Sequence, residues 1–212
     1  MGLILGVDTC GATGTLALAR FDSGRIAVLG ESEIAGKTYS AMLTPRIREL
    51  LGAHNVALHQ LETIVVVNGP GSFTGVRVGV STVKGLVEAL NIPVVAVSRL
   101  AVLAQKAKMD CAVLDAGRGE FYFGDYREGR HEALFSVDEV SSACSEQKLV
   151  GCEERTALAF PSAEIVAQPT ATDATHFSWA RIQSRDFDDP VLLDGNYLRR
   201  ADAEVKMSAL KS

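Results

Sequence analysis

The segment 68–75 contains the residues of this chain best suited to chemistry. It reads NGPGSFTG and lies between a β-branched apolar run at 63–67 and a helical pattern at 74–90. At such a junction the free N–H groups and the helix dipole favour an anion, and glycines allow close backbone approach. The segment matches neither G-x-G-x-x-G, nor Walker A, nor G-x-S-x-G. It therefore predicts either a phosphate contact or a structural tight turn.

Several single residues are candidates of another kind. Asp8 follows the first apolar run, where it could hold a metal-bound water or a phosphate, or form an Asx turn. Cys10 could act as a nucleophile or fill a small buried space. Ser72, Asp115 and His176 could in principle form a catalytic triad, although any chain offers such a choice. The four histidines show no i,i+3 or i,i+4 pair and no H-E-x-x-H motif, so no metal site is predicted.

The hydrophobic pattern of the first half indicates the elements that position these residues. Strands are expected at 3–7, 15–19, 25–33, 63–67 and 93–97, and helices at 38–52, 74–90 and 100–106. Pro45 should kink the first of these helices or delay its start. The order β-β-β-α-β-α-β-α is typical of half an α/β domain with a mixed sheet.

The second half is less regular but repeats one feature of the first. Strands are expected at 111–115, 120–126 and 148–151, a helix at 173–184, and a polar tail at 194–200 that wraps back. The run LDA at 114–116 echoes VDT at 7–9, since each ends a strand in Asp before a glycine-rich turn. We therefore expect two lobes of common plan, residues 1–108 and a shortened 109–212.

Two further features have a structural and a functional interpretation. Gly75 and Gly79 lie one turn apart in the predicted helix, which also contains Gly85. Small residues there permit close packing inside the fold or against another subunit. Arg118 and Glu120 flank a glycine turn and Arg199 lies in the tail, where surface ion pairs are the simplest expectation.

Composition restricts the class of protein. The chain has 212 residues, 47% of them hydrophobic and 22% charged, and a net charge of −5. These values exclude wholesale disorder and disfavour a nucleic-acid binder that works by charge alone. The four cysteines form no C-x-x-C pair, as expected in a reducing cytosol. No run approaches 18 apolar residues and no basic leader is present, so a cytoplasmic protein without membrane spans is expected.

Longer runs resemble a known family. NGPGSFTGVRVG at 68–79 continues as TVKGL at 82–86, and LGVDT occurs at 5–9, LDAGRGEFY at 114–122 and NYLRR at 196–200. Together these runs resemble the TsaB (YeaZ) family of bacterial tRNA threonylcarbamoyladenosine biosynthesis proteins, over essentially the whole chain. The resemblance implies an α/β fold of the actin-like, hsp70-like and sugar-kinase (ribonuclease H-like) type, with a complete first lobe and a reduced second lobe.

The resemblance also implies a role. The chain would be a non-catalytic scaffold beside the catalytic paralogue TsaD and the ATPase TsaE. That complex adds a threonylcarbamoyl group to the adenosine next to the anticodon of tRNAs that read A-starting codons. The implied partners are TsaD, as a heterodimer, TsaE, tRNA through the complex, and a second copy in isolation. The resemblance implies no catalytic residue, no metal and no independently bound cofactor.

Two sets of site residues follow from the resemblance. The helices at 38–52 and 74–90 would form the partner interface, with candidates Tyr39, Leu43, Ile47, Val76, Gly79, Val80, Val83 and Val87. ATP or ADP could bind at the TsaD interface, with candidate contacts Asp8, Thr9, Gly71, Ser72 and Arg118.

Two departures bear on these expectations. In TsaD-like proteins a His-x-x-x-His metal site follows the strand at this point, whereas this chain reads SRLAV at 98–102. Many TsaB members begin the first helix with His-Ser, which is Tyr39-Ser40 here. A glycoprotease-type peptidase and a small-molecule kinase of the same superfamily stay as alternatives. The first lacks a visible ligand set or triad, and the second lacks a full second lobe.

Overall fold

The first sheet forms from the apolar runs of the first hundred residues. A computed structural model describes residues 2–22, 24–36, 38–144 and 147–199. The strands are β1 (Gly2–Asp8), β2 (Thr13–Phe21), β3 (Ile26–Ala35), β4 (Thr63–Val67) and β5 (Val94–Val97). Their order is β3-β2-β1-β4-β5; β2 and β3 are antiparallel, and β1, β4 and β5 are parallel. Every residue of β4 is buried, as expected for a strand covered on both faces.

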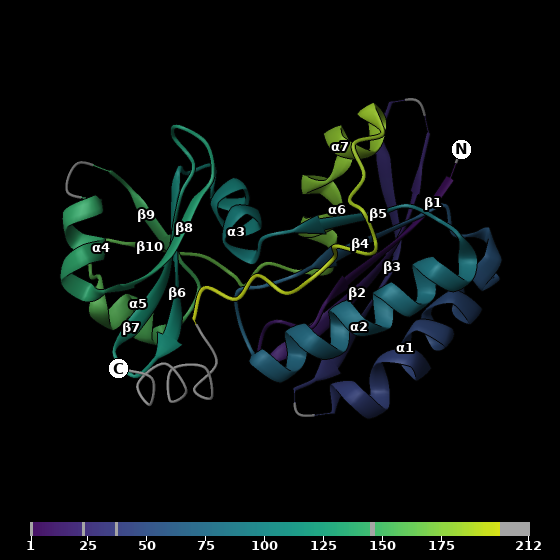
Figure 1. The fold of residues 1–212 in the computed structure, drawn as a ribbon, viewed down its shortest axis with the longest axis horizontal. Coiled ribbons are helices and arrows are strands. Elements are labelled where there is room, and N and C mark those ends of the chain that lie inside the picture. Colours follow the sequence, from purple (N-terminus) through teal and green to yellow (C-terminus); the bar gives the residue numbers. More distant parts are fainter. Residues whose placement is uncertain (1, 23, 37, 145–146, 200–212) are drawn as a thin grey trace, which may run out of the picture.

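Helices cover both faces of this sheet. Helix α1 (Tyr39–Ala53) and helix α2 (Phe73–Leu90) pack side by side on one face, joined through the 3₁₀ turn η1 (Leu58–Gln60) and β4 (Figure 1). Helix α1 begins at Tyr39, so Pro45 lies inside it and does not delay its start. Helix α6 (Ala171–Phe177) lies on the opposite face, followed by α7 (Trp179–Ser184).

The second sheet is smaller. Its strands are β6 (Cys111–Gly117), β7 (Glu120–Asp125), β8 (His131–Ser136), β9 (Leu149–Gly151) and β10 (Glu164–Ile165), in the order β10-β9-β6-β7-β8. Short helices α4 (Val137–Ala143) and α5 (Glu154–Ala159) accompany it. The predicted strands at its centre are present, whereas β8, β10, α4 and α5 were not predicted. Each of these four is seven residues or shorter, which is too short for a clear periodic pattern.

Helix α3 (Arg99–Ala107) joins the two lobes. Leu100 and Leu103 pack with Leu114 and Val150 of the second sheet, whereas Val102 belongs to the core of the first. The lobes therefore share an apolar contact through one helix. None of the helices within the described ranges is both long enough and apolar enough to cross a membrane.

The chain returns to the first lobe after β10. Ala174 and Ile182 are buried in the core of the first sheet. Helices α6 and α7 therefore pack on the first sheet, whereas Leu198 further along the chain packs with the second-lobe cluster. The division into lobes 1–108 and 109–212 stays a prediction. The helix predicted at 173–184 is two helices divided at Ser178, whose hydroxyl donates to the Ala174 carbonyl.

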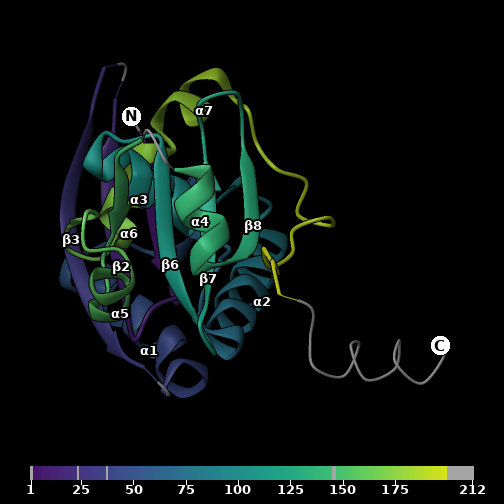
Figure 2. The same cartoon turned by 90° about the vertical axis from the view of Figure 1, so that its left-hand side faces the viewer.

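The described C-terminal segment, 187–199, forms a strap along the molecule (Figure 2). Asp188 N–H donates to the Val94 carbonyl at 3.0 Å, so the strap begins at the free edge of β5. Asn196 N–H donates to the Asn68 carbonyl at 2.7 Å, and the Arg199 guanidinium donates to Glu120 and to the Gly117 carbonyl in the second lobe. The predicted wrapping of 194–200 is thus found for its residues up to 199, and residue 200 lies outside the described residues.

Candidate functional site

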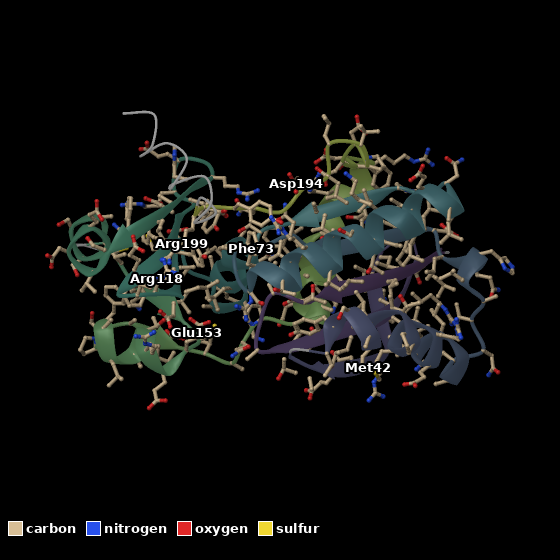
Figure 3. All side chains as sticks on the ribbon, turned by 60° about the horizontal axis from the view of Figure 1, so that its bottom comes forward. Met42, Phe73, Arg118, Glu153, Asp194 and Arg199 are labelled. Atoms are coloured by element: carbon tan, nitrogen blue, oxygen red, sulfur yellow. The ribbon has the colours of Figure 1, made fainter. Side chains whose placement is uncertain are left out.

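A cleft of about 540 Å³ opens between the lobes. The β1–β2 turn, the N-terminus of α2 and the start of α3 form its first-lobe wall. The end of β6, Tyr122 and Glu153 form the opposite wall. Figure 3 shows Glu153 and Arg118 on the second-lobe side of this junction and Phe73 on the first-lobe side. The two lobes therefore enclose a space of the size that small-molecule sites have.

The two strands that end at the cleft have the same turn geometry. Asp8 Oδ1 accepts the Cys10 N–H at 2.8 Å, and Asp115 Oδ1 accepts the Gly117 N–H at 2.8 Å. In each case the aspartate side chain accepts from the backbone N–H two residues later, which defines an Asx turn. The sequence echo between 7–9 and 114–116 thus has a structural counterpart, and the structural interpretation of Asp8 holds in this structure.

The glycine-rich loop before α2 packs against the β1–β2 turn. Ser72 N–H donates to the Cys10 carbonyl at 2.8 Å, and Thr9 Oγ1 donates to the Gly75 carbonyl at 2.7 Å. A Cβ atom on Gly71 would collide with the Cys10 carbonyl, and one on Gly75 with the Thr9 carbonyl. The glycines thus allow two stretches of backbone to touch each other. The tight-turn interpretation of the loop explains these contacts without a phosphate.

The five expected nucleotide contacts occupy different positions. Gly71 and Ser72 line the cleft. Asp8 and Thr9 are buried behind its wall, with their side chains engaged in the bonds given above. Arg118 lies in the turn after β6 and does not line the cleft. Two of the five residues therefore face the space where a ligand would lie, and their contact with a nucleotide stays a prediction.

Arg99 is the cleft residue that the sequence analysis missed. Its side chain is 3% exposed, and one guanidinium nitrogen donates to Gln168 Oε1 at 3.2 Å. Another lies 3.8 Å from Glu153 Oε1, across the junction of the lobes. Arg99 Nε has no hydrogen-bond partner within the described residues. The sequence offered one signal, a charged residue directly before the apolar run at 100–104, because arginine is rarely buried without a partner.

Burial governs the electrostatics of the cleft wall. Desolvation raises the pKa of Asp8, and the Arg99 charge opposes that rise only in part. Desolvation also raises the pKa of Glu153, against the bond from Asp115 N–H and the attraction of Arg99. Burial therefore disfavours both carboxylates as anions, and Arg99 is a cation that offsets this effect in part at each of them.

The candidate catalytic residues do not come together. Ser72 and Asp115 line the cleft, but His176 lies on α6 in a separate pocket with Lys106. Cys10 is buried, its thiol donates to the Val67 carbonyl at 3.2 Å, and burial raises its pKa well above the ordinary value. Within the described ranges, no three His, Cys, Asp or Glu side chains are grouped so that they could hold a metal ion.

The eight residues expected at a partner interface all lie in the core of this chain. Their side chains face the first sheet, and none of the seven with a side chain beyond Cα is more than 5% exposed. Gly79 is also buried, against the Thr9 side chain. The eight candidates are apolar or small residues at helical spacing, and such spacing marks the face that a helix buries in its own domain. Residues that touch a partner through these helices must lie on the outward faces.

The outward face of the helix pair is rich in small residues. Helix α2 exposes Ser81, Gly85 and Ala89, and a Cβ atom on Gly85 would meet nothing within 4 Å. A groove of about 330 Å³ lies beside it, between the last turns of α1, the η1 turn and Leu86. Ser81, Gly85 and Ala89 recur every four residues, so this stripe of α2 would allow another helix to approach closely.

Comparisons with known proteins agree with the resemblance. A family model described as TsaD, tRNA N6-adenosine threonylcarbamoyltransferase, matches residues 32–178, which is more than half of the chain. The protein TsaB of Bacillus subtilis is 38% identical over 129 residues, covering 58% of this chain and 55% of that protein. TsaB of Escherichia coli is 30% identical over 130 residues, covering 58% and 54%.

The chain belongs to the TsaB (YeaZ) family, and the TsaD family model also matches it.

Other relatives extend the match. An uncharacterized protein of Mycobacterium tuberculosis is 30% identical over 206 residues, covering 95% of this chain and 93% of its own length. The crystal structure of YeaZ from Pseudomonas aeruginosa has a TM-score of 0.73 at 28% identity, covering 93% of this chain and 100% of that one. The actin-like α/β fold is thereby confirmed. This chain spans about half the length of the TsaB relatives it matches in Bacillus subtilis and Escherichia coli.

Proposed function

We propose that this chain is an accessory, non-catalytic subunit in the synthesis of threonylcarbamoyladenosine in tRNA. It would bind a catalytic TsaD subunit and work with the ATPase TsaE on tRNAs that read A-starting codons. The observation that supports this role most strongly is the match to proteins named TsaB, which are described as tRNA threonylcarbamoyladenosine biosynthesis proteins.

The chemistry of the cleft supports an accessory role. The residues at the position of a TsaD-like metal motif have structural roles: Ser98 Oγ accepts the Ala101 N–H and caps α3, and Arg99 holds Gln168. Cys10 is bonded and buried, and His176 is remote from Ser72. No observation favours the peptidase alternative, which requires an activated nucleophile.

The outward face of α1 and α2 is the proposed docking surface for TsaD, and for a second copy when TsaD is absent. Gly85 and its small neighbours would let a partner helix approach closely, and Leu86 borders the groove that could receive an apolar side chain.

A nucleotide would be shared with TsaD rather than held independently, because the loop at Gly71 and Ser72 is already closed onto Cys10.

Reconstituted tRNA modification tests this proposal. TsaD and TsaE from the same organism are mixed with tRNA and threonylcarbamoyl adenylate, with and without this chain, and the modified nucleoside is quantified by mass spectrometry. We expect no product from the chain alone and a strong dependence of TsaD on its presence. Modification by the chain alone, or equal product when it is omitted, would contradict the proposal. Binding of ATP to the isolated chain would instead support the kinase alternative, in which the nucleotide would lie in the cleft between the lobes.

A further inference from the structure

Exposed apolar side chains gather along one flank of α2. Phe73 is 44% exposed and Tyr197 is 39% exposed, while Val191 and Leu192 are 80% and 78% exposed. Phe73 belongs to the first turn of α2, and the other three lie on the strap. Large apolar residues exposed together commonly mark an interaction surface, whereas single ones need no explanation.

The strap is fixed to the helix, so this flank is a defined surface. Lys84 Nζ donates to the carbonyls of Val191 at 3.2 Å and Leu193 at 3.0 Å. At the other end the rings of Phe73 and Tyr197 pack with centroids 5.5 Å apart. Residues 73, 77 and 84 fall on one stripe of α2, so the strap runs beside that stripe for about 16 Å, at 1.5 Å per helical residue. We call this surface, formed by Phe73, Arg77, Val191, Leu192 and Tyr197, the strap flank.

Arg77 gives the strap flank its charge. Its guanidinium carbon lies 3.8 Å above the centre of the Phe73 ring and 5.9 Å from that of Tyr197. Arg77 has no ion pair among the described residues, whereas the ammonium group of Lys84 is occupied by two carbonyls. Stacking on the aromatic rings holds the guanidinium in place, and its hydrogen-bonding edge stays available for a carboxylate.

We propose that the strap flank docks the catalytic partner subunit through an apolar face of that partner that presents a carboxylate to Arg77. This inference rests on the proposed function, and it extends the docking surface from the outward face of α2 to the rim opposite α1. Two exposed aromatics and an arginine are the residue types that dominate the energy of protein interfaces. The exposed aliphatic pair at 191–192 and the net charge of −5 favour a protein over RNA.

The test measures the affinity of the full chain for TsaD by fluorescence anisotropy and sedimentation velocity. The variants are Arg77→Glu, Arg77→Ala and the double change Val191→Ser with Leu192→Ser. Matched controls are Arg25→Glu, an exposed arginine in the β2–β3 turn, and Leu158→Ser, an apolar residue 75% exposed in the second lobe. Circular dichroism and thermal unfolding establish that each variant is folded.

We expect Arg77→Glu to raise the dissociation constant at least tenfold, Arg77→Ala to raise it less, and both controls to leave it unchanged. Binding of the unmodified chain should weaken with added salt, and that dependence should be smaller for Arg77→Ala. Equal binding by all variants would overturn the strap flank while leaving the proposed function intact. Loss only of self-association, or only of tRNA retention by the complex, would assign the flank to a second copy or to RNA and overturn the proposal. Absence of a complex with the unmodified chain would count against the proposed function itself.

Discussion

At the scale of single residues, Arg99 connects the two lobes electrostatically. It is almost fully buried, lies 3.8 Å from Glu153 across the lobe junction, and compensates the carboxylate of Asp8. A buried arginine in such a position is costly to remove, because truncation leaves buried carboxylates without a counter-charge. Its role is therefore to hold the lobes in a fixed relation around the cleft.

Truncating this arginine should destabilise the protein. Arg99→Ala is expected to lower the free energy of unfolding by about 3 kcal/mol, measured by urea denaturation at pH 7. Arg46→Ala is the matched control, since Arg46 forms an exposed i,i+3 pair with Glu49 that is worth about 0.5 kcal/mol at most. Equal effects of the two substitutions would show that the buried charge has no special role.

The sequence allowed some site residues to be predicted and not others. The Asx turn at Asp8 is local, because the acceptor and donor are two residues apart, so residue type was sufficient. Arg99 acts through Glu153 and Gln168, which lie more than fifty residues away along the chain. No single sequence reports such a pairing, so this contact had to come from the structure.

At the scale of elements, α2 has three distinct sides. Its inward stripe, with Val83 at the centre, packs on the sheet, and its N-terminal glycines touch the β1–β2 turn. Its outward side exposes Gly85, and its flank holds the strap. Apolar periodicity predicted the helix correctly, but it reports only the inward stripe, and the α2 residues expected at the interface lie on that buried stripe.

Alanine substitution at two glycines of α2 should change the stability of the protein in opposite directions. Gly75→Ala is expected to cost about 3 kcal/mol, because the added Cβ collides with the Thr9 carbonyl. Gly85→Ala should stabilise by about 0.8 kcal/mol, because its Cβ meets nothing within 4 Å and alanine favours the helix. Thermal and urea unfolding of both variants checks this difference, and a destabilising Gly85→Ala would show that the outward face is not free.

At the scale of the whole molecule, Glu132 connects the second lobe to the strap. Its side chain on β8 is 4% exposed and accepts hydrogen bonds from Tyr126 at 2.7 Å, from Arg130 at 3.0 Å, and from Asn196 of the strap. Burial alone would raise the pKa of Glu132, but bonds from Arg130, Ser98 and Tyr126 outweigh it and hold the pKa below its ordinary value. One of the contacts that hold the strap is thus made to an ionised carboxylate.

This carboxylate should give part of the stability a pH dependence of definite sign. A lowered pKa in the folded state stabilises the protein above the ordinary glutamate pKa of 4.5, and the gain is lost as pH falls through the folded value. Glu132→Gln should therefore cost about 2 kcal/mol at pH 7, and the difference in unfolding free energy from the unmodified protein should narrow as pH falls below 4.5. Urea unfolding across this range checks the prediction, with exposed Glu88→Gln as a control near zero. A gap that widens in acid would contradict it.

The most direct test of the proposed role is sedimentation velocity of this chain with TsaD from the same organism, for the unmodified protein and for Gly85→Arg. The substitution has room on the exposed outward face and replaces glycine with a better helix former, so the variant should fold at least as well. We predict a stable mixed complex with the unmodified chain and its loss with Gly85→Arg, because the arginine would occupy the space of the partner helix. A folded, unmodified chain that forms no complex with TsaD, or a Gly85→Arg variant that binds as tightly, would contradict docking through this helix pair.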